Sequence, residues 1–144
     1  MLVSQILKSK ADDRVVTALP SITVAQAAQM LSERRIGTLI ISRDDRVPDG
    51  IVSERDVVRQ LGSAGAACLD QPVSSIMTSK LVTCTRDMRA DAVLEQMTEG
   101  RFRHMPVLED DALIGLISLG DVVKARLMEL AMEKDALEGM IRGH

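Results

Sequence analysis

The chain has 144 residues, of which 46% are hydrophobic and 27% are charged, a balance typical of a folded globular protein rather than a disordered one. Its 18 Lys and Arg against 21 Asp and Glu give a net charge of −3, which disfavours nucleic-acid binding because no strong positive field attracts phosphates. With one Phe and no Trp or Tyr, the chain is also a poor candidate for an aromatic-lined sugar or single-strand binding surface.

The first half of the chain alternates short apolar strands with amphipathic helices. We predict a strand near 15–17, a helix over 23–34, strands over 38–42 and 51–52 separated by a turn at Asp44 and Asp45, and a second helix that begins at Ser53. Within the first helix, Val24, Ala27, Ala28 and Leu31 recur at the spacing of one buried face. The strands are almost continuously apolar, which indicates sheets that are covered on both faces.

The second half repeats this order of elements. Residues 50–59 align with 115–124, and residues 36–41 align with 102–107. We predict a strand near 81–84, a helix over 90–99, strands over 104–108 and 113–117 around a turn at Asp110 and Asp111, and a helix that begins at Ser118. The fold class is therefore α/β (α+β), with two pseudo-symmetric β-α-β-β-α motifs.

The repeat also sets the predicted boundaries. The first motif covers 1–61, a small and Gly-rich linker covers 62–71 and is expected to be mobile, and the second motif covers 72–126. A C-terminal helical extension covers 127–144. Its apolar stripe, interrupted by Lys134, consists of Leu127, Leu130, Leu137 and Ile141. The stripe either packs on its own domain or forms a subunit contact, and we favour the contact because the stripe extends beyond the repeated unit.

Two equivalent Ser-x-x-Asp motifs stand where a strand turns into a helix: Ser53 with Asp56, and Ser118 with Asp121. One interpretation is helix capping, since Ser satisfies free backbone N–H groups and Asp complements the helix dipole. The other is ligand binding, in which the Asp accepts two hydrogen bonds from a vicinal diol while the neighbouring amides and hydroxyl face a phosphate. The duplication favours binding only modestly, because a duplicated fold also duplicates its caps.

The twice-repeated pattern Gly-h-h-Ser-x-x-Asp-h-h, where h is apolar, resembles that of a tandem pair of cystathionine-β-synthase (CBS) domains, often called a Bateman module. Ser75-Ile76-Met77-Thr78 before the second copy and residues 101–107 within it strengthen the resemblance, which covers nearly the whole chain apart from the C-terminal extension. It implies that the two motifs pack sheet to sheet around two clefts. Members commonly bind adenosine nucleotides there, including AMP, ADP, ATP, NAD(H) or S-adenosylmethionine, and AMP is the ligand we expect here.

The resemblance also implies roles for individual residues. Asp56 and Asp121 would hold the ribose hydroxyls. The phosphate contacts would come from Ser53, Ser118, Arg55, Lys124, Arg103 and His104. The adenine pocket would be lined by Thr17, Ala18, Ile36, Gly37, Thr38, Val52, Thr83, Cys84, Phe102, Met105, Pro106 and Ile117.

The two copies differ at the basic positions. Arg103 supplies forked charged donors and His104 donates when protonated, although His104 could equally be a half-buried strand residue bonded to backbone. Gly37 and Thr38 stand at the matching positions of the first copy and carry no charge. Neighbouring arginines such as Arg55 could supply that charge, but arginines beside helices are more often solvated. We therefore expect the two sites to differ in affinity.

The remaining features are negative. No nucleophile is paired with a base and no Gly-rich loop precedes a helix, so we expect no enzyme and no catalytic cofactor. His104, Met105 and His144 have no third ligand at a recognisable spacing, so we expect no metal site. Cys68 and Cys84 form no C-x-x-C pattern, which favours reduced thiols.

Residues 1–8 do not resemble a signal peptide, and no apolar run is long enough to cross a bilayer, so we expect a cytoplasmic protein with no membrane partner. The sequence favours a homodimeric sensor module that binds an adenosine nucleotide and signals to a partner protein. A ligand-free structural dimerisation module and a small enzyme acting on nucleotides remain as alternatives.

Overall fold

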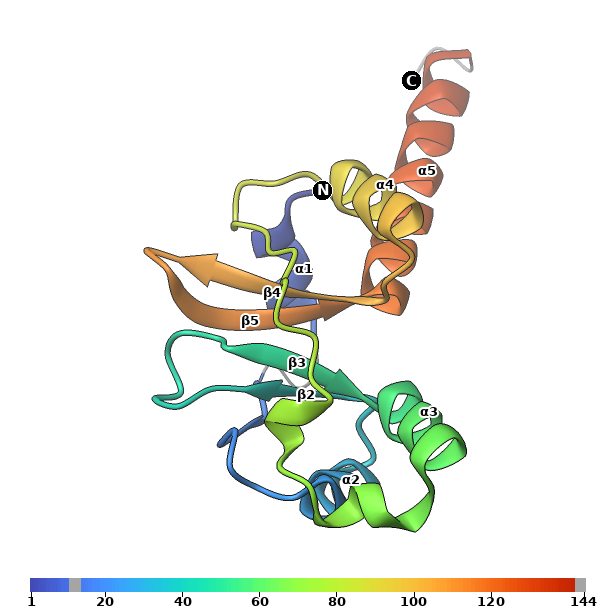
Figure 1. The fold of residues 1–144 in the computed structure, drawn as a ribbon. Helices are drawn as coiled ribbons and strands as arrows, with labels where there is room; N and C mark the ends of the chain where they lie inside the picture. The colour runs from blue at the N-terminus through green and yellow to red at the C-terminus, as the bar shows by residue number, and fades with distance from the viewer. Residues whose placement is uncertain (11–13, 142–144) are drawn as a thin grey trace. The chain divides into compact units, whose positions relative to one another are not determined.

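The computed structural model describes residues 1–10 and 14–141, and Figure 1 shows its helices and strands. The predicted C-terminal extension is thus described as far as residue 141, and His144 lies outside the described residues. In chain order the elements are α1 (Val3–Ser9), β1 (Thr17–Ala18), α2 (Val24–Arg34), β2 (Thr38–Ile41), β3 (Gly50–Ser53), α3 (Glu54–Ala64), the 3-10 helices η1 (Gly65–Asp70) and η2 (Val73–Ser75), α4 (Ala90–Gly100), β4 (His104–Glu109), β5 (Ala112–Ser118) and α5 (Leu119–Ile141).

Most predicted elements are confirmed. The helix predicted over 23–34 is α2, with Thr23 as its N-cap, and the helix predicted over 90–99 is α4. The predicted inner strands of both copies are β2, β3, β4 and β5, and the strand predicted near 15–17 is the short β1. The sheets have the orders β1-β2-β3 and β4-β5. The mixed α and β fold with a long C-terminal helix is therefore confirmed.

The strand predicted near 81–84 is wrong, because a single parallel bridge joins Cys84 to β4 instead. Its counterpart in the first copy is β1, which pairs in parallel with β2 over two residues. There the Ile40 N–H donates to Val16 O at 3.2 Å. Pro106 stands at the place of Ile40 in the second copy and has no N–H to donate. The missing hydrogen bond reduces the parallel ladder to the Cys84 bridge.

The segment predicted as a linker, residues 62–71, is mostly helical. Helix α3 continues to Ala64, and η1 follows it directly. Gly65 has a φ of 72° where the two helices meet, a conformation that glycine adopts more easily than other residues. The small, Gly-rich composition of this segment therefore marks the end of a helix.

The described chain divides into two compact units. The first-copy unit holds Arg14–Val82 and Glu109–Ile114. The second-copy unit holds residues 1–10, Thr83–Leu108 and residues 115–141. Each predicted set of site residues falls inside one unit.

A further repeat, which the sequence analysis missed, explains how the N-terminal residues join the second copy. Residues 3–10 and 73–80 share the pattern Val-Ser-x-Ile and end in Lys. Leu2 forms an antiparallel bridge with the N-cap residue of α4, and Pro72 forms the same bridge with the N-cap residue of α2. The segment that precedes each copy in the sequence therefore packs in the unit of the other copy.

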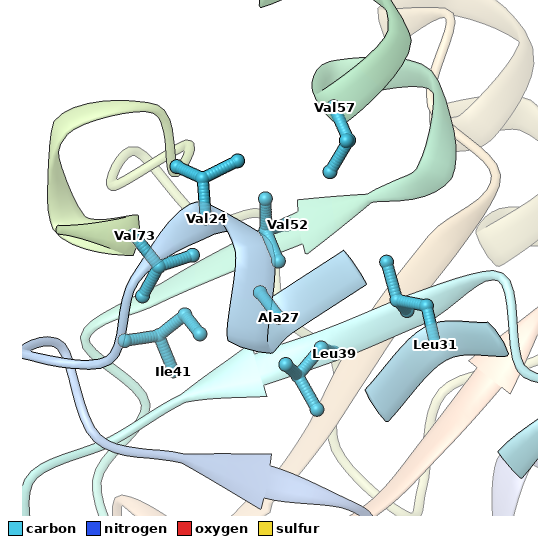
Figure 2. Packing of buried hydrophobic residues seen from close by; sticks show 8 residues of the cluster. All are labelled: Val24, Ala27, Leu31, Leu39, Ile41, Val52, Val57 and Val73. Atoms are coloured by element: carbon cyan, nitrogen blue, oxygen red, sulfur yellow. The ribbon is translucent and has the colours of Figure 1, made fainter. Parts of the chain in front are cut away.

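The core of the first-copy unit shows why this sequence forms these elements. In Figure 2 the buried face of α2 meets side chains from β2 and β3, with α3 and η2 completing the cluster. Of the predicted helix positions, 24, 27 and 31 are buried there, and Ala28 is partly buried against the cluster. Burial contributes about 1.5–3 kcal/mol for each large aliphatic side chain. The cluster consists of Val24, Ala27, Leu31, Leu39, Ile41, Val52, Val57 and Val73.

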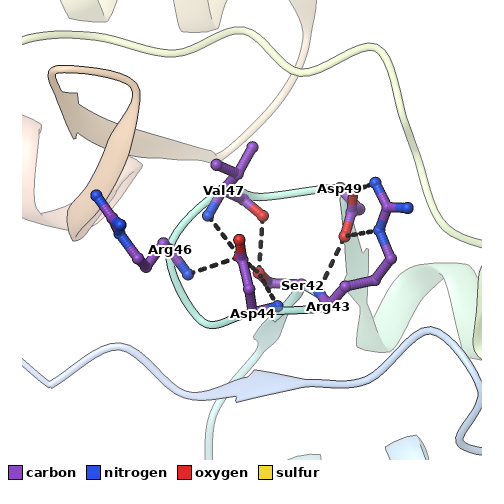
Figure 3. A network of polar contacts seen from close by, with 6 residues as sticks. All are labelled: Ser42, Arg43, Asp44, Arg46, Val47 and Asp49. Carbon is purple, nitrogen blue, oxygen red and sulfur yellow. Dashed lines mark hydrogen bonds and ion pairs between the residues drawn. The ribbon is translucent and has the colours of Figure 1, made fainter.

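The connection between β2 and β3 is held by polar contacts (Figure 3). Asp44 Oδ1 accepts the backbone N–H groups of Arg46 at 3.0 Å and Val47 at 2.9 Å. These N–H groups, that of Val47 first, lower the pKa of the Asp44 carboxyl. Arg43 Nη2 donates to Asp49 Oδ1 at 3.1 Å. The second copy uses a shorter connection, in which Asp110 and Asp111 lie between β4 and β5 with φ values of 50° and 63°.

Helix α5 is buried only near its start. Val122 and Ala125 are buried, and the helix contacts α4 and α1 (Figure 1). From Leu127 onward its large apolar side chains are exposed. No helix in the described part of the chain is long and apolar enough to cross a membrane.

Candidate functional site

Both Ser-x-x-Asp motifs form helix caps. In the first-copy unit the Ser53 N–H donates to Asp56 Oδ2 at 2.8 Å, and the Asp56 N–H donates to Ser53 Oγ at 3.2 Å. In the second-copy unit the same two bonds join Ser118 and Asp121 at 2.9 Å and 3.1 Å. The capping interpretation is therefore confirmed, and the caps fix both carboxylates at the first turn of their helices.

The cation beside each carboxylate differs between the units. Arg59, one turn further along α3, lies 3.5 Å from Asp56 through Nη1 and Oδ1. In the second-copy unit the cation is Lys10, whose Nζ lies 3.0 Å from Asp121 Oδ2. The same Nζ donates to Leu116 O at 2.8 Å, so Lys10 has two partners. Burial raises the pKa of Asp121, but the Ser118 N–H and Lys10 lower it by more, and the net pKa is below the ordinary value.

The start of β4 is fixed against the start of α5. The Leu119 N–H donates to Arg103 O at 2.7 Å, as the Glu54 N–H donates to Gly37 O at 3.0 Å in the first-copy unit. His104 is half-buried, and this burial lowers its pKa. Asp121 raises that pKa, whereas Lys10 and Arg103 lower it. Lys10 and Asp121 are in contact, both influence the pKa of His104, and Arg103 is its neighbour in the chain, so we name these four residues the charge cluster.

The predicted phosphate contacts are only partly assembled. The two serines bond to the capped carboxylates. Arg103 precedes β4 and is exposed, as are Arg55 on α3 and Lys124 on α5, whereas His104 at the start of β4 is half-buried. In the described residues no ion pair joins Arg55 to Asp56 or Lys124 to Asp121. Lys10 was not predicted as a site residue because it lies outside the Ser-x-x-Asp motif. The pattern that could have identified it is the repeated Val-Ser-x-Ile segment, which ends in Lys in both copies.

The residues predicted for the first adenine pocket lie in or next to the sheet of the first-copy unit. Thr17 and Ala18 are half-buried in β1, and the Thr17 hydroxyl donates to Asp45 Oδ1 at 2.5 Å. Ile36 and Gly37 precede β2, and Thr38 is opposite Ser53 in the β2–β3 register. Val52 is fully buried in the core.

The residues predicted for the second adenine pocket are more deeply buried. Met105 and Ile117 are fully buried, and Cys84 and Pro106 are buried. Thr83 is half-buried, as is Phe102, whose ring lies against Gly100. Burial raises the pKa of the Cys84 thiol to about 12, which makes it unreactive as a thiolate near neutral pH. Among residues 1–10 and 14–141, no group of three or more His, Cys, Asp or Glu side chains could hold a metal ion.

Comparison with known proteins agrees with the duplicated fold. The sequence model of the CBS domain matches residues 3–63 and 73–128. The mitochondrial CBS domain-containing protein CBSX3 of Arabidopsis thaliana is 32% identical over 148 residues, which cover 98% of this chain and 72% of that protein.

Solved structures show the same likeness. A CBS-domain-containing protein from Agrobacterium tumefaciens is 43% identical, with a TM-score of 0.83 over 88% of this chain and 99% of that one. A CBS domain protein from Pyrobaculum aerophilum, complexed with AMP, is 26% identical, with a TM-score of 0.77 over 92% of this chain and 99% of that one. The chain therefore belongs to the CBS domain family and carries two CBS domains in tandem.

Proposed function

We propose that the chain is a regulatory module that binds an adenosine nucleotide and reports its occupancy to a partner protein, without catalysis of its own. The observation that carries this proposal is the pair of capped carboxylates, Asp56 and Asp121, each fixed at a helix start beside a cation. The AMP bound to the relative from Pyrobaculum aerophilum supports the ligand class. AMP is the first ligand to test, with ATP and NAD(H) as further candidates. We also propose a cytoplasmic location, in keeping with the two free, buried cysteines.

The chemistry of each proposed site follows from its cap. A carboxylate accepts both hydroxyls of a ribose, and charge strengthens such hydrogen bonds relative to neutral ones. The N-terminus of the following helix carries a partial positive charge, which favours a phosphate nearby. Arg103 adds a full charge in the second-copy unit. An anionic nucleoside ligand satisfies these groups together.

The direct test is calorimetric titration of the purified chain with AMP, ADP, ATP, NAD(H) and S-adenosylmethionine. Because the chain has no Trp or Tyr, a co-purified nucleotide would also dominate its absorbance near the adenine maximum. We expect binding of at least one ligand, and its loss in the double variant Asp56→Asn with Asp121→Asn. If no ligand produces heat and the absorbance spectrum shows no nucleotide, the alternative of a ligand-free dimerisation module replaces this proposal.

We further propose that the chain forms a homodimer through α5. Four large apolar side chains are exposed along its C-terminal part: Leu127 at 63%, Leu130 at 50%, Leu137 at 58% and Ile141 at 78%. Light scattering should give twice the chain mass of 15.7 kDa. The variant Leu130→Lys with Leu137→Lys should be monomeric, whereas Met132→Lys, an equally exposed change off the stripe, should remain dimeric. A wild-type monomer at tens of micromolar would rule out this interface.

A further inference from the structure

Lys10 is held in one place in the second-copy unit although it precedes the first copy in the sequence. Its side chain is only 23% exposed, and its Nζ is bonded to Leu116 O and Asp121 Oδ2. Ordering a lysine side chain costs conformational entropy, so a fixed lysine needs compensating contacts. An ammonium group has three N–H donors, and within residues 1–10 and 14–141 two of them are used. One donor therefore remains for a ligand bound at Asp121.

Asp121 bonds to its cap and to this lysine through one carboxylate oxygen. The Ser118 N–H and Lys10 both bond to Oδ2. Within the described residues, Oδ1 has no hydrogen-bond partner. Asp121 can therefore keep its cap and its lysine while Oδ1 accepts a ligand hydroxyl.

The charge cluster as a whole is suited to an anion. Lys10 and Arg103 each carry a positive charge, whereas Asp121 carries one negative charge. Burial lowers the pKa of His104, and the cluster has a net positive charge in either form of that histidine, because two cations stand against one carboxylate. A phosphate close to Asp121 would be repelled by the carboxylate alone, and Lys10 offsets that repulsion at a distance of 3.0 Å.

The first-copy unit lacks this arrangement. Lys80 stands at the position of Lys10 in the repeated leading segment, but it is exposed, and no ion pair joins it to Asp56 in the described part of the chain. The carbonyl of Ile51, which matches that of Leu116, accepts the backbone N–H of Thr78 at 2.9 Å instead. Lys10 therefore gives the second-copy unit a donor that the repeat itself does not supply.

We propose that Lys10 contacts the ligand of the second-copy site and makes that site select adenosine compounds bearing a phosphate over neutral adenosine. This inference rests on the proposed nucleotide-binding function and adds to it the residue that determines ligand class. Lys10 and Arg103 together receive the phosphate, and Asp121 receives the ribose.

The test compares Lys10→Met with Lys10→Arg and with Lys8→Met, a matched control in which an exposed lysine on α1 is changed. All three are made in an Asp56→Asn background, which removes the first-copy site. Each is titrated with AMP and with adenosine, and its thermal unfolding is recorded to verify folding. Loss of one charged hydrogen bond predicts that Lys10→Met weakens AMP binding about tenfold while adenosine binding changes less than about threefold. Lys10→Arg should retain most of the affinity, and Lys8→Met should match its background.

The outcomes separate this inference from the proposed function. If the wild-type chain binds AMP but Lys10→Met binds it equally well, only the role of Lys10 is overturned. Tighter AMP binding by Lys10→Met would also overturn it, since Lys10 would then compete with the ligand. An equal loss of AMP and adenosine binding would assign Lys10 to the fold rather than to the phosphate. Absence of AMP binding by the wild-type chain overturns the proposed function together with this inference.

Discussion

The starts of α3 and α5 have the same local chemistry but different electrostatic surroundings. Both carry a Ser-x-x-Asp capping box with nearly equal hydrogen-bond lengths. Asp56 faces Arg59 from its own helix, whereas Asp121 faces Lys10 from a segment far away in the sequence. A duplicated motif thus preserves the cap that four consecutive residues determine, and the two copies diverge where tertiary packing supplies the charged partner.

The two sheets also differ, in this case in their backbone hydrogen bonds. The β2–β3 pair is extended by a parallel third strand, whereas the β4–β5 pair has only the bridge at Cys84. One substitution accounts for this difference, since Pro106 cannot donate the bond that Ile40 donates.

Core truncation should reveal whether the units unfold separately. Leu39 and Met105 occupy equivalent, fully buried positions of the two copies. Replacing either with Ala should destabilise the protein by about 2–5 kcal/mol, because a cavity remains. Hydrogen exchange measured by mass spectrometry should show faster exchange mainly in the unit that carries the change. The exposed control Met132→Ala, off the α5 stripe, should cost less than about 0.5 kcal/mol. Equal acceleration in both units would contradict separate unfolding.

Single carboxylate substitutions should remove one site each. Asp56→Asn and Asp121→Asn keep a cap acceptor but lose the charge, which strengthens a hydrogen bond to about 1.5–3 kcal/mol. Affinity at the altered site should therefore fall at least about tenfold with little change in stability. Calorimetry would show this as a lower binding stoichiometry. As a matched control, Asp110→Asn removes a charge in the β4–β5 turn and should bind normally. Unchanged affinity in Asp121→Asn would show that Asp121 is a cap and nothing more.

Two glycines contact the segments 3–10 and 73–80, each of which packs in the unit of the other copy, and can be used to test that packing. A Cβ on Gly50 would lie 2.8 Å from Met77 Cγ, and a Cβ on Gly115 would lie 2.7 Å from Leu7 Cδ2. Either change to Ala should cost about 1–3 kcal/mol through overpacking. Combining it with Met77→Ala or Leu7→Ala should cost less than the sum of the single changes in chemical denaturation. Gly62→Ala, with open space around it, should be neutral or stabilising. Additive losses would mean that these contacts do not hold the segments.

The elements that could be predicted from the sequence are those set by local patterns. The apolar periodicity at positions 24, 27 and 31 predicted α2, and Ser53 and Ser118 predicted the starts of two helices. Helix α1 was missed because seven residues do not form a stable helix alone. Its first turn depends on distant carbonyls, since the Val3 N–H donates to Met88 O at 2.9 Å.

The candidate site could be predicted only in part for the same reason. The capped carboxylates follow from a four-residue motif, so the sequence was sufficient to find them. Lys10 contacts Asp121 only because its segment packs in the unit of the other copy. Local sequence patterns do not predict that packing. The lost strand at 81–84 likewise depends on Pro106, which belongs to the neighbouring strand.

The smallest predicted effect is the acid dependence of the Lys10–Asp121 pair. Because the folded-state pKa of Asp121 is below its ordinary value of 3.8, the pair stabilises the fold fully above that pH. This contribution is lost as the pH falls through the folded-state pKa. The side chains are 23% and 25% exposed, so solvent screening limits the contribution to below about 1 kcal/mol. Urea unfolding at pH 7 should show wild type more stable than Lys10→Met, and the difference should shrink as the pH falls below 3.8 and through the folded-state pKa. Lys8→Met should show no such trend. A wild-type advantage that stays unchanged throughout acid titration of the folded protein would assign the stability to the Lys10–Leu116 hydrogen bond rather than to the ion pair, because a carbonyl does not titrate in this range.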